Sequence, residues 1–109
     1  MGSEELQKEI QALIKYMKEN FPKHMSVFGE LVQVVEGKGY LDTKTKELIT
    51  IALAVKAECE WCIEFHVKKA LEAGAKPEEI IEAAWVAVLM GGGPSLMYII
   101  PVLKALGKI

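Results

Sequence analysis

The stretch from Ala83 to Leu103 contains no charged residue, and it limits what this chain can fold into more than any other feature. So apolar a stretch must be buried in a core, against another subunit or in a bilayer. The run Gly91-Gly92-Gly93-Pro94 interrupts it in the middle, and Pro101 lies near its end. Because glycine and proline interrupt helices, we expect two buried apolar helices that meet at the glycines rather than one membrane span. The second should run from Pro94 to about Leu106, with a kink or break at Pro101.

The other apolar residues recur with helical spacing, and no β-alternating run of useful length is present. Helices should begin at Ser3, after Asp42 and at Pro77, and the helix that carries both cysteines should end at Gly74. The helix from Pro77 should bury Ile80, Ile81, Ala84, Trp85, Val88 and Leu89. With 109 residues, we expect one domain over residues 1–109. Its fold class should be all-α, a compact single-domain array of about five to seven helices.

The composition excludes several classes of partner. The chain is 51% hydrophobic and 26% charged with a net charge of −2, which leaves no basic patch for nucleic acid or for a membrane surface. A single close pair of cysteines cannot staple a small secreted scaffold, and no signal-like segment precedes it, so we expect a cytoplasmic protein. The uncharged stretch holds more apolar surface than one small domain buries easily, which predicts a homo-oligomer.

Both cysteines lie in the segment Cys59-Glu60-Trp61-Cys62, and His66 follows one helical turn later. On a helix these thiols and the imidazole share one stripe, and the Cα atoms of Cys59 and Cys62 should be roughly 5 Å apart, which a disulfide accepts. A reactive cysteine needs a lowered pKa, and both the helix start and an imidazole can lower it. His66 should lie about 6 Å along the axis from Cys62 and about 10 Å from Cys59. We therefore predict Cys62 as the nucleophile and Cys59 as its resolving partner.

Other interpretations of these residues stay open. The two thiols and His66 could simply pack in a helical core. A zinc site normally needs four protein ligands, and here one cysteine pair and one nearby histidine are present, so we expect no metal and no other cofactor. His24 should have a surface or core role, because nothing reactive surrounds it in sequence. On composition alone, Glu47 should be solvated, and Glu64 should lie on the polar side of its helix with Lys68.

Several further residues surround the cysteine pair at fixed spacing. They are Lys46-Glu47-Leu48-Ile49, the apolar run Ile51–Val55, Cys59-Glu60-Trp61-Cys62, His66, Ala70, Gly74-Ala75 and Glu79-Ile80. This pattern, from Leu41 to Trp85, resembles the AhpD-like branch of the carboxymuconolactone decarboxylase family. The resemblance implies an AhpD-like all-helical fold, a homo-oligomer that is a hexamer or a trimer, and thiol-dependent peroxidase or disulfide reductase chemistry. It also implies a proton relay, carried by Glu47, His66, Cys62 and Cys59.

The relay can be checked against helix geometry. On one straight helix Glu47 would lie about 18 Å from Cys59, too far for any relay. If the chain instead reverses near Ala57-Glu58, the two helices become antiparallel and Glu47 comes alongside His66. We therefore expect a hairpin here.

Our leading hypothesis is a thiol-disulfide oxidoreductase that acts on a small peroxide or disulfide, with a dithiol or protein reductant that the sequence does not identify. The alternatives are a carboxymuconolactone decarboxylase-like protein of other activity, or a helical oligomer whose cysteines are redox-sensing or inert. We favour a hexamer over a trimer by resemblance.

Overall fold

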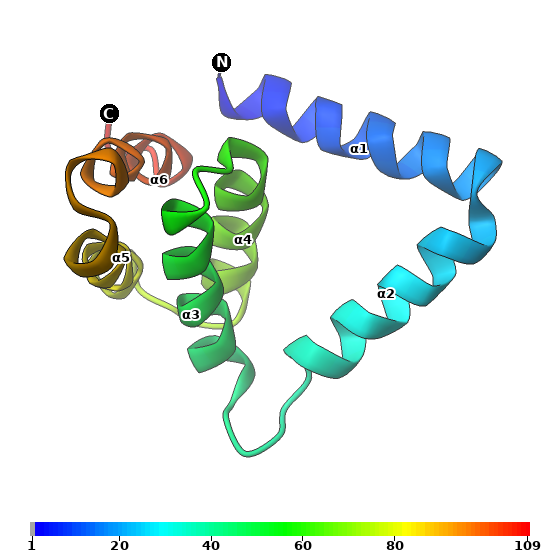
Figure 1. Cartoon of the computed structure of the whole chain (residues 1–109), viewed down its shortest axis with the longest axis horizontal. Helices are drawn as coiled ribbons and strands as arrows, with labels where there is room; N and C mark the ends of the chain where they lie inside the picture. The colour runs from blue at the N-terminus through cyan, green and yellow to red at the C-terminus, as the bar shows by residue number, and fades with distance from the viewer. Residues whose placement is uncertain (1) are drawn as a thin grey trace.

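The structure, a computed structural model, describes residues 2–109 and consists of six helices joined by short turns (Figure 1). The helices are α1 (Ser3–Asn20), α2 (Pro22–Glu36), α3 (Thr43–Lys56), α4 (Glu60–Glu72), α5 (Pro77–Met97) and α6 (Ile99–Ala105). None of the described residues forms a strand. The all-α prediction is therefore confirmed, and the number of helices lies within the predicted range.

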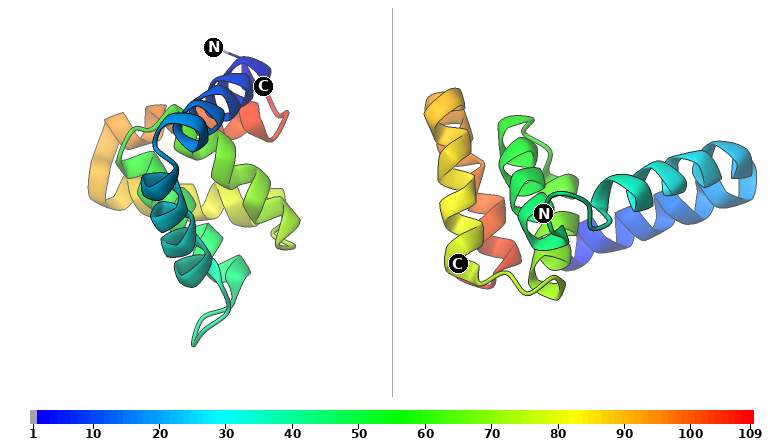
Figure 2. Two further views of the ribbon diagram at one scale, coloured as in Figure 1. Left: turned by 90° about the vertical axis from the view of Figure 1, so that its right-hand side faces the viewer. Right: turned by 90° about the horizontal axis from the view of Figure 1, so that it is seen from below.

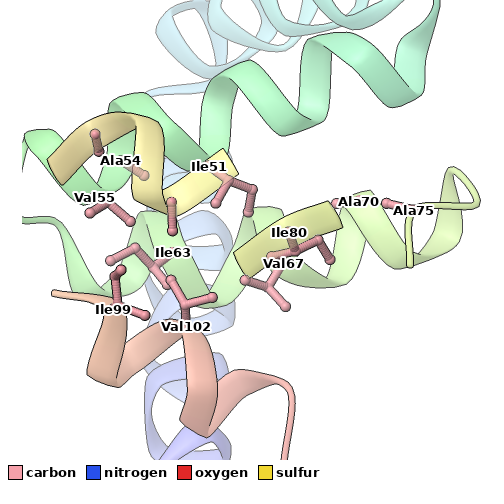
Figure 3. Close-up of a cluster of buried hydrophobic side chains, with 12 residues drawn as sticks. Ile51, Ala54, Val55, Ile63, Val67, Ala70, Ala75, Ile80, Ile99 and Val102 are labelled. Carbon is pink, nitrogen blue, oxygen red and sulfur yellow. The ribbon is translucent and has the colours of Figure 1, made fainter. Parts of the chain in front are cut away.

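Helices α3, α4, α5 and α6 pack together and form the body of the molecule (Figure 1). The core consists of small and branched apolar side chains contributed by all four helices (Figure 3). Its fully buried members are Ile51 and Val55 from α3, Ile63, Val67 and Ala70 from α4, Ile80 and Ala84 from α5, and Val102 from α6. Because α3 and α4 form a hairpin inside this packing, the start of α4 is held rigidly against the end of α3.

Helices α1 and α2 extend away from the body as an arm (Figure 2). Leu6, near the start of α1, is the one buried residue of that helix, and α2 has none. The arm exposes many large apolar side chains, which include Leu13, Tyr16, Val27, Phe28, Leu31, Val34 and Val35. Soluble proteins that act as monomers rarely expose contiguous apolar surface of this extent.

Local signals explain where the central helices begin and end. The side chain of Asp42 caps α3, because its Oδ1 accepts a hydrogen bond of 2.7 Å from the backbone N–H of Thr45. Hydrogen bonding to the side chain and backbone of Thr45 holds the pKa of Asp42 below its usual value. Gly74, with φ of 94°, follows the end of α4 in the left-handed conformation that glycine adopts most easily. Both predicted signals are confirmed.

The predicted corner between the apolar helices is confirmed, but the predicted break at Pro101 is wrong. Gly92 has φ of 66° and ψ of −147°, which bends α5 sharply inside the glycine run. The next interruption falls at Tyr98, and Pro101 lies in the first turn of α6. The first turn accepts proline because its N–H groups have no partner within the helix, so Pro101 breaks no hydrogen bond there.

The outer side of α5 differs from the prediction. Trp85 and Leu89 were expected to be buried, yet 52% and 82% of their surfaces are exposed. Both continue the side of α5 on which the exposed Glu78 and Glu82 lie, and this side faces away from the body. By length and composition, α5 is the one helix among the described residues that could cross a membrane, and 22% of its apolar stretch is buried. This test carries little weight, because core helices pass it as well.

Candidate redox site

The two cysteines form a disulfide at the start of α4. Their Cα atoms are 5.2 Å apart, close to the predicted separation. Cys59 is the N-cap of α4 rather than a residue of its first turn, with extended φ and ψ of −109° and 99°. Its Sγ accepts a hydrogen bond of 3.2 Å from the backbone N–H of Cys62. Cys62 is exposed and Cys59 is half-buried, so a molecule from solvent reaches Cys62 more easily.

The chain reverses between α3 and α4 at the predicted position. Ala57 is the C-cap of α3, and Glu58 then adopts a left-handed conformation with φ of 57°. The N–H of Cys59 donates to the carbonyl of Ala54 at 3.2 Å, which ties the cysteine back to the helix before the turn. This hairpin fixes the register of α3 against α4, and with it the neighbours of His66.

The hairpin brings Glu47 and His66 together. Nδ1 of His66 lies 3.0 Å from one carboxylate oxygen of Glu47 and 3.3 Å from the other. Glu47 is only 1% exposed, whereas 19% of the His66 side chain is exposed. The expectation from composition that Glu47 is solvated is therefore wrong, and the expectation from hairpin geometry that it lies beside His66 is confirmed. A carboxylate so deeply buried needs a donor, and His66 supplies it.

Glu36 and Lys69 extend this pair into a network that the sequence did not predict. Lys69 Nζ donates to Glu36 Oε2 at 2.8 Å, and Glu36 Oε1 lies 3.9 Å from Nδ1 of His66. The hydrogen bond that Lys69 donates to Glu36 raises the pKa of Lys69 above its usual value. Glu36 ends α2 and lies 33 residues before Lys69 in the chain, a separation at which no helical spacing rule operates.

The same network contains the one set of side chains among the described residues that could hold a metal ion. Ligand atoms of Glu36, Glu47 and His66 lie within 4.8 Å of one another. The ammonium group of Lys69 already neutralises Glu36 there, so the protein supplies its own cation. A cavity of about 240 Å³ opens beside the network, with Glu72 and Thr43 also in its wall. Solvent can therefore reach the network from one side.

The other side of α4 faces α1, and here the sequence misled. Glu64 was expected on a polar surface, yet it is 2% exposed, and its Oε1 accepts a hydrogen bond of 3.2 Å from Gln7. Trp61, between the cysteines, donates from its indole nitrogen to Glu9 at 3.1 Å. Both contacts attach α1 to the first turns of α4. His24 lies outside the site, exposed and packed edge-on against Phe21, as predicted.

In this oxidised form the imidazole and the sulfur atoms are not directly linked. Among residues 2–109, no hydrogen bond joins His66 to Cys59 or Cys62. When a carboxylate accepts the Nδ1–H of a histidine, Nε2 becomes the basic nitrogen. The site thus holds a disulfide, an oriented imidazole and a buried carboxylate on one helical hairpin, the set that thiol chemistry with proton transfer requires.

Fold and site together define an all-helical protein with a dithiol that can close to a disulfide. The chain belongs to the carboxymuconolactone decarboxylase family, whose model matches residues 22–105.

Relatives and solved structures agree with this assignment. The chain is 44% identical over 82 residues to "uncharacterized protein 4 in cox locus" of Paracoccus denitrificans, which covers 75% of this chain and 74% of that protein. A crystal structure of apo-lpg0406, a carboxymuconolactone decarboxylase family protein from Legionella pneumophila, superposes with a TM-score of 0.92 at 40% identity over 97% of this chain and 95% of that one. A family member from Thermotoga maritima, for which a part in an antioxidative response has been suggested, has a TM-score of 0.82 at 26% identity, over 95% and 88% of the two chains.

Proposed function

We propose that this protein is a cytoplasmic thiol-disulfide oxidoreductase that cycles between a Cys59/Cys62 dithiol and a disulfide, with a hydroperoxide as its favoured oxidant. The observation that carries the proposal is the position of the Cys59–Cys62 bridge, at the start of α4 and on the same hairpin as the buried Glu47–His66 pair. The suggested antioxidative part of the Thermotoga maritima relative is consistent with this chemistry.

Reduction of the disulfide begins at Cys62, the more exposed of the two cysteines. A thiolate of the reductant attacks Sγ of Cys62, the Cys59–Cys62 bond breaks, and Cys59 leaves as a thiolate. The N–H of Cys62 already donates to Sγ of Cys59, so the negative charge appears where a hydrogen-bond donor and the helix start stabilise it. A second thiol of the reductant then resolves the mixed disulfide and releases Cys62. Two electrons pass from the reductant to the protein.

Oxidation runs through the same sulfur. The thiolate of Cys62 attacks the outer oxygen of a hydroperoxide, the O–O bond breaks, and Cys62 becomes a sulfenic acid while the alkoxide takes a proton and leaves as an alcohol. The thiol of Cys59 then condenses with the sulfenic acid, which releases water and restores the disulfide. The short Cα separation of 5.2 Å lets this bond form without a backbone rearrangement.

His66 moves the protons and Glu47 positions it. Nε2 of His66 takes the proton of the Cys62 thiol and later gives it to the departing alkoxide. Glu47 holds the Nδ1–H, fixes the tautomer and offsets the positive charge that forms on the ring. We assign no metal or other cofactor to this cycle.

The active form in this proposal is a homo-oligomer, with a hexamer favoured over a trimer. Two surfaces support it: the arm, in which α2 has no buried residue, and the outer side of α5, where Trp85, Val86, Leu89 and Met90 are exposed. Light scattering at micromolar concentration should give a mass several times 12.1 kDa. A well-behaved monomer would count against this part of the proposal.

The proposal is tested by assaying the reduced protein with hydrogen peroxide and with an organic hydroperoxide. One disulfide should form per chain, with loss of one equivalent of oxidant, and a dithiol donor should regenerate both thiols. Cys62→Ser should abolish oxidant consumption, whereas Cys59→Ser should allow one oxidation and no intramolecular bond. If both thiols stay reduced under mild peroxide in the native protein, the cysteines are inert. If they form the disulfide but no donor turns them over, a redox-sensing role replaces the enzymatic one.

A further inference from the structure

The last residue of α2, Glu36, reaches the redox site from the arm. Helix α2 has no buried residue, yet only 18% of the Glu36 side chain is exposed. Figure 1 shows α2 returning to the body near the start of α3, and there the hydroxyl group of Thr43 donates to the backbone carbonyl of Glu36 at 3.0 Å. The backbone of Glu36 is therefore fixed against α3, the helix that carries Glu47.

The two carboxylate oxygens of Glu36 have different neighbours. Oε2 accepts a hydrogen bond of 2.8 Å from Lys69, whereas Oε1 lies 3.9 Å from Nδ1 of His66. A distance of 3.9 Å is too long for a hydrogen bond, so Glu36 acts on the ring through its charge. Because Lys69 restrains the carboxylate, the charge stays close to the ring.

The charges around the imidazole favour its protonated form. Within residues 2–109, Glu47 and Glu36 are the residues that form ion pairs with His66, and Lys69 pairs with Glu36. Two carboxylates and one ammonium group leave one negative charge, which a proton on the imidazole would neutralise. The exposed Glu72 adds a carboxylate to the cavity wall beside them. Charged groups from the other helices that pack against α4 make contacts elsewhere: Glu9 of α1 with Trp61, Glu79 of α5 with Lys44, and Lys104 of α6 in a separate cavity wall.

We propose that Glu36 is a second positioning residue of the redox site, whose charge stabilises the imidazolium that forms when Nε2 of His66 takes the proton of the Cys62 thiol. This role rests on the proposed function, because it belongs to the same proton transfer. Glu47 fixes the tautomer through a direct hydrogen bond, and Glu36 adds charge without one. If Glu36 served only to hold the end of α2, its contact with Lys69 would suffice and its charge would not affect His66.

An NMR titration of the oxidised, full-length protein tests whether the charge of Glu36 acts on His66. The chain has two histidines, so each Cε1–H signal can be followed against pH, with the exposed His24 as an internal control. In Glu36→Gln the midpoint of the His66 signal should fall by roughly 0.5–1 pH unit, because a partly neutralised carboxylate is lost. Glu36→Asp keeps the charge and should lower the midpoint less. The matched control Glu72→Gln removes a carboxylate from the same cavity wall and should shift the midpoint by less than about 0.2 unit, because solvent screens this exposed charge.

The rate at which iodoacetamide alkylates Cys62 in the reduced protein tests whether the effect reaches the thiol. In Glu36→Gln the rate at neutral pH should fall about three- to tenfold, in line with the expected shift of the His66 midpoint, and the rate profile should move to higher pH. The proposal is overturned if the His66 midpoint is unchanged in Glu36→Gln, if it moves equally in Glu72→Gln, or if it moves without a change in alkylation. Neither measurement depends on turnover, so a protein that consumes no hydroperoxide would refute the proposed function, while these two measurements would still decide the role of Glu36.

Discussion

Two glutamates are buried on the α3–α4 hairpin, and their surroundings differ in one respect. Glu47 on α3 is 1% exposed, and both its oxygens lie within 3.3 Å of His66. Glu64 on α4 is 2% exposed, and one of its oxygens has no partner among the described residues. The comparison teaches that burial alone does not assign a role to a carboxylate. Glu47 can position His66 through both its oxygens, whereas Glu64 is held through one oxygen alone, by Gln7.

The largest expected effect concerns turnover. Glu47→Gln and His66→Gln should each slow thiol-dependent turnover on the order of 100-fold, since the general base loses its orientation or is removed. The double variant should be little worse than either single one, because residues that act as a unit are not additive. Stopped-flow oxidation of the reduced protein measures this, with folding checked by circular dichroism. The alkylation rate profile of Cys62 should also move to higher pH in both variants.

Glu64→Gln is the matched change on the other side of α4. It removes a charge from an equally buried position that the proposed cycle does not use, so turnover should fall far less than in Glu47→Gln. If Glu47→Gln and Glu64→Gln lose activity equally, the two glutamates do not differ in their role in turnover. If the fold losses of turnover in Glu47→Gln and His66→Gln multiply in the double variant, the carboxylate and the imidazole act as separate structural residues, which would contradict the proposed relay.

The next effect concerns stability, where the two sites should respond in opposite directions. Glu64→Met replaces a half-satisfied carboxylate with an apolar side chain of similar size and should raise the free energy of unfolding by about 1–2 kcal/mol. Glu47→Met leaves the partly buried His66 without its acceptor and should lower that free energy by about 1–3 kcal/mol. Urea denaturation of both reduced variants gives the two signs. A loss of stability in Glu64→Met would mean that Glu64 is satisfied in solution.

A substitution in the turn between α3 and α4 should have a smaller effect on stability. Glu58 has φ of 57°, a conformation that costs a non-glycine residue about 1–2 kcal/mol. Glu58→Gly removes that cost but adds unfolded-state freedom, so a gain of about 0.5–1 kcal/mol in the free energy of unfolding is expected. The urea midpoint of this variant against that of Glu60→Gly, which places glycine at the start of α4, provides the measurement. A gain in both variants would contradict the explanation.

The helix ends around the hairpin site could be predicted from local signals, because Asp42 and Gly74 act on their own neighbours in the chain. The reversal at Ala57-Glu58, which sets Glu47 beside His66, was expected only because the relay implied by the resemblance requires it. The role of Glu47 itself came from a family resemblance, since composition alone had placed it in solvent.

The features that the sequence did not predict all depend on which elements pack together. Glu64 is buried because α1 crosses α4, and Lys69 finds Glu36 because α2 ends near α4. Trp85 lies on the outer side of α5, three residues after the exposed Glu82, although the uncharged stretch that begins at Ala83 does not mark this side any further. The spacing of apolar residues shows which side of a helix is apolar, but it does not show which other helix packs against that side.

The smallest expected effect concerns the pH dependence of stability at the edge of the Glu47 site. The hydrogen bond to Glu36 raises the pKa of Lys69 above its usual value of 10.5, so the charged lysine is more stable in the folded protein than in the unfolded chain. A raised pKa means that the stabilisation is fully present below pH 10.5 and is lost as the pH rises through the folded pKa.

The difference in urea midpoint between the wild type and Lys69→Met should therefore be constant at neutral pH and should shrink above pH 10.5. Because about a third of the lysine side chain is exposed, solvent screens the pair and the difference should be small. Lys68→Met is the control, because Lys68 is exposed on the same helix and the same lysine charge is lost there. If both variants show the same pH profile, the Glu36–Lys69 contact does not stabilise the folded protein, and Glu36 is free to interact with His66 instead.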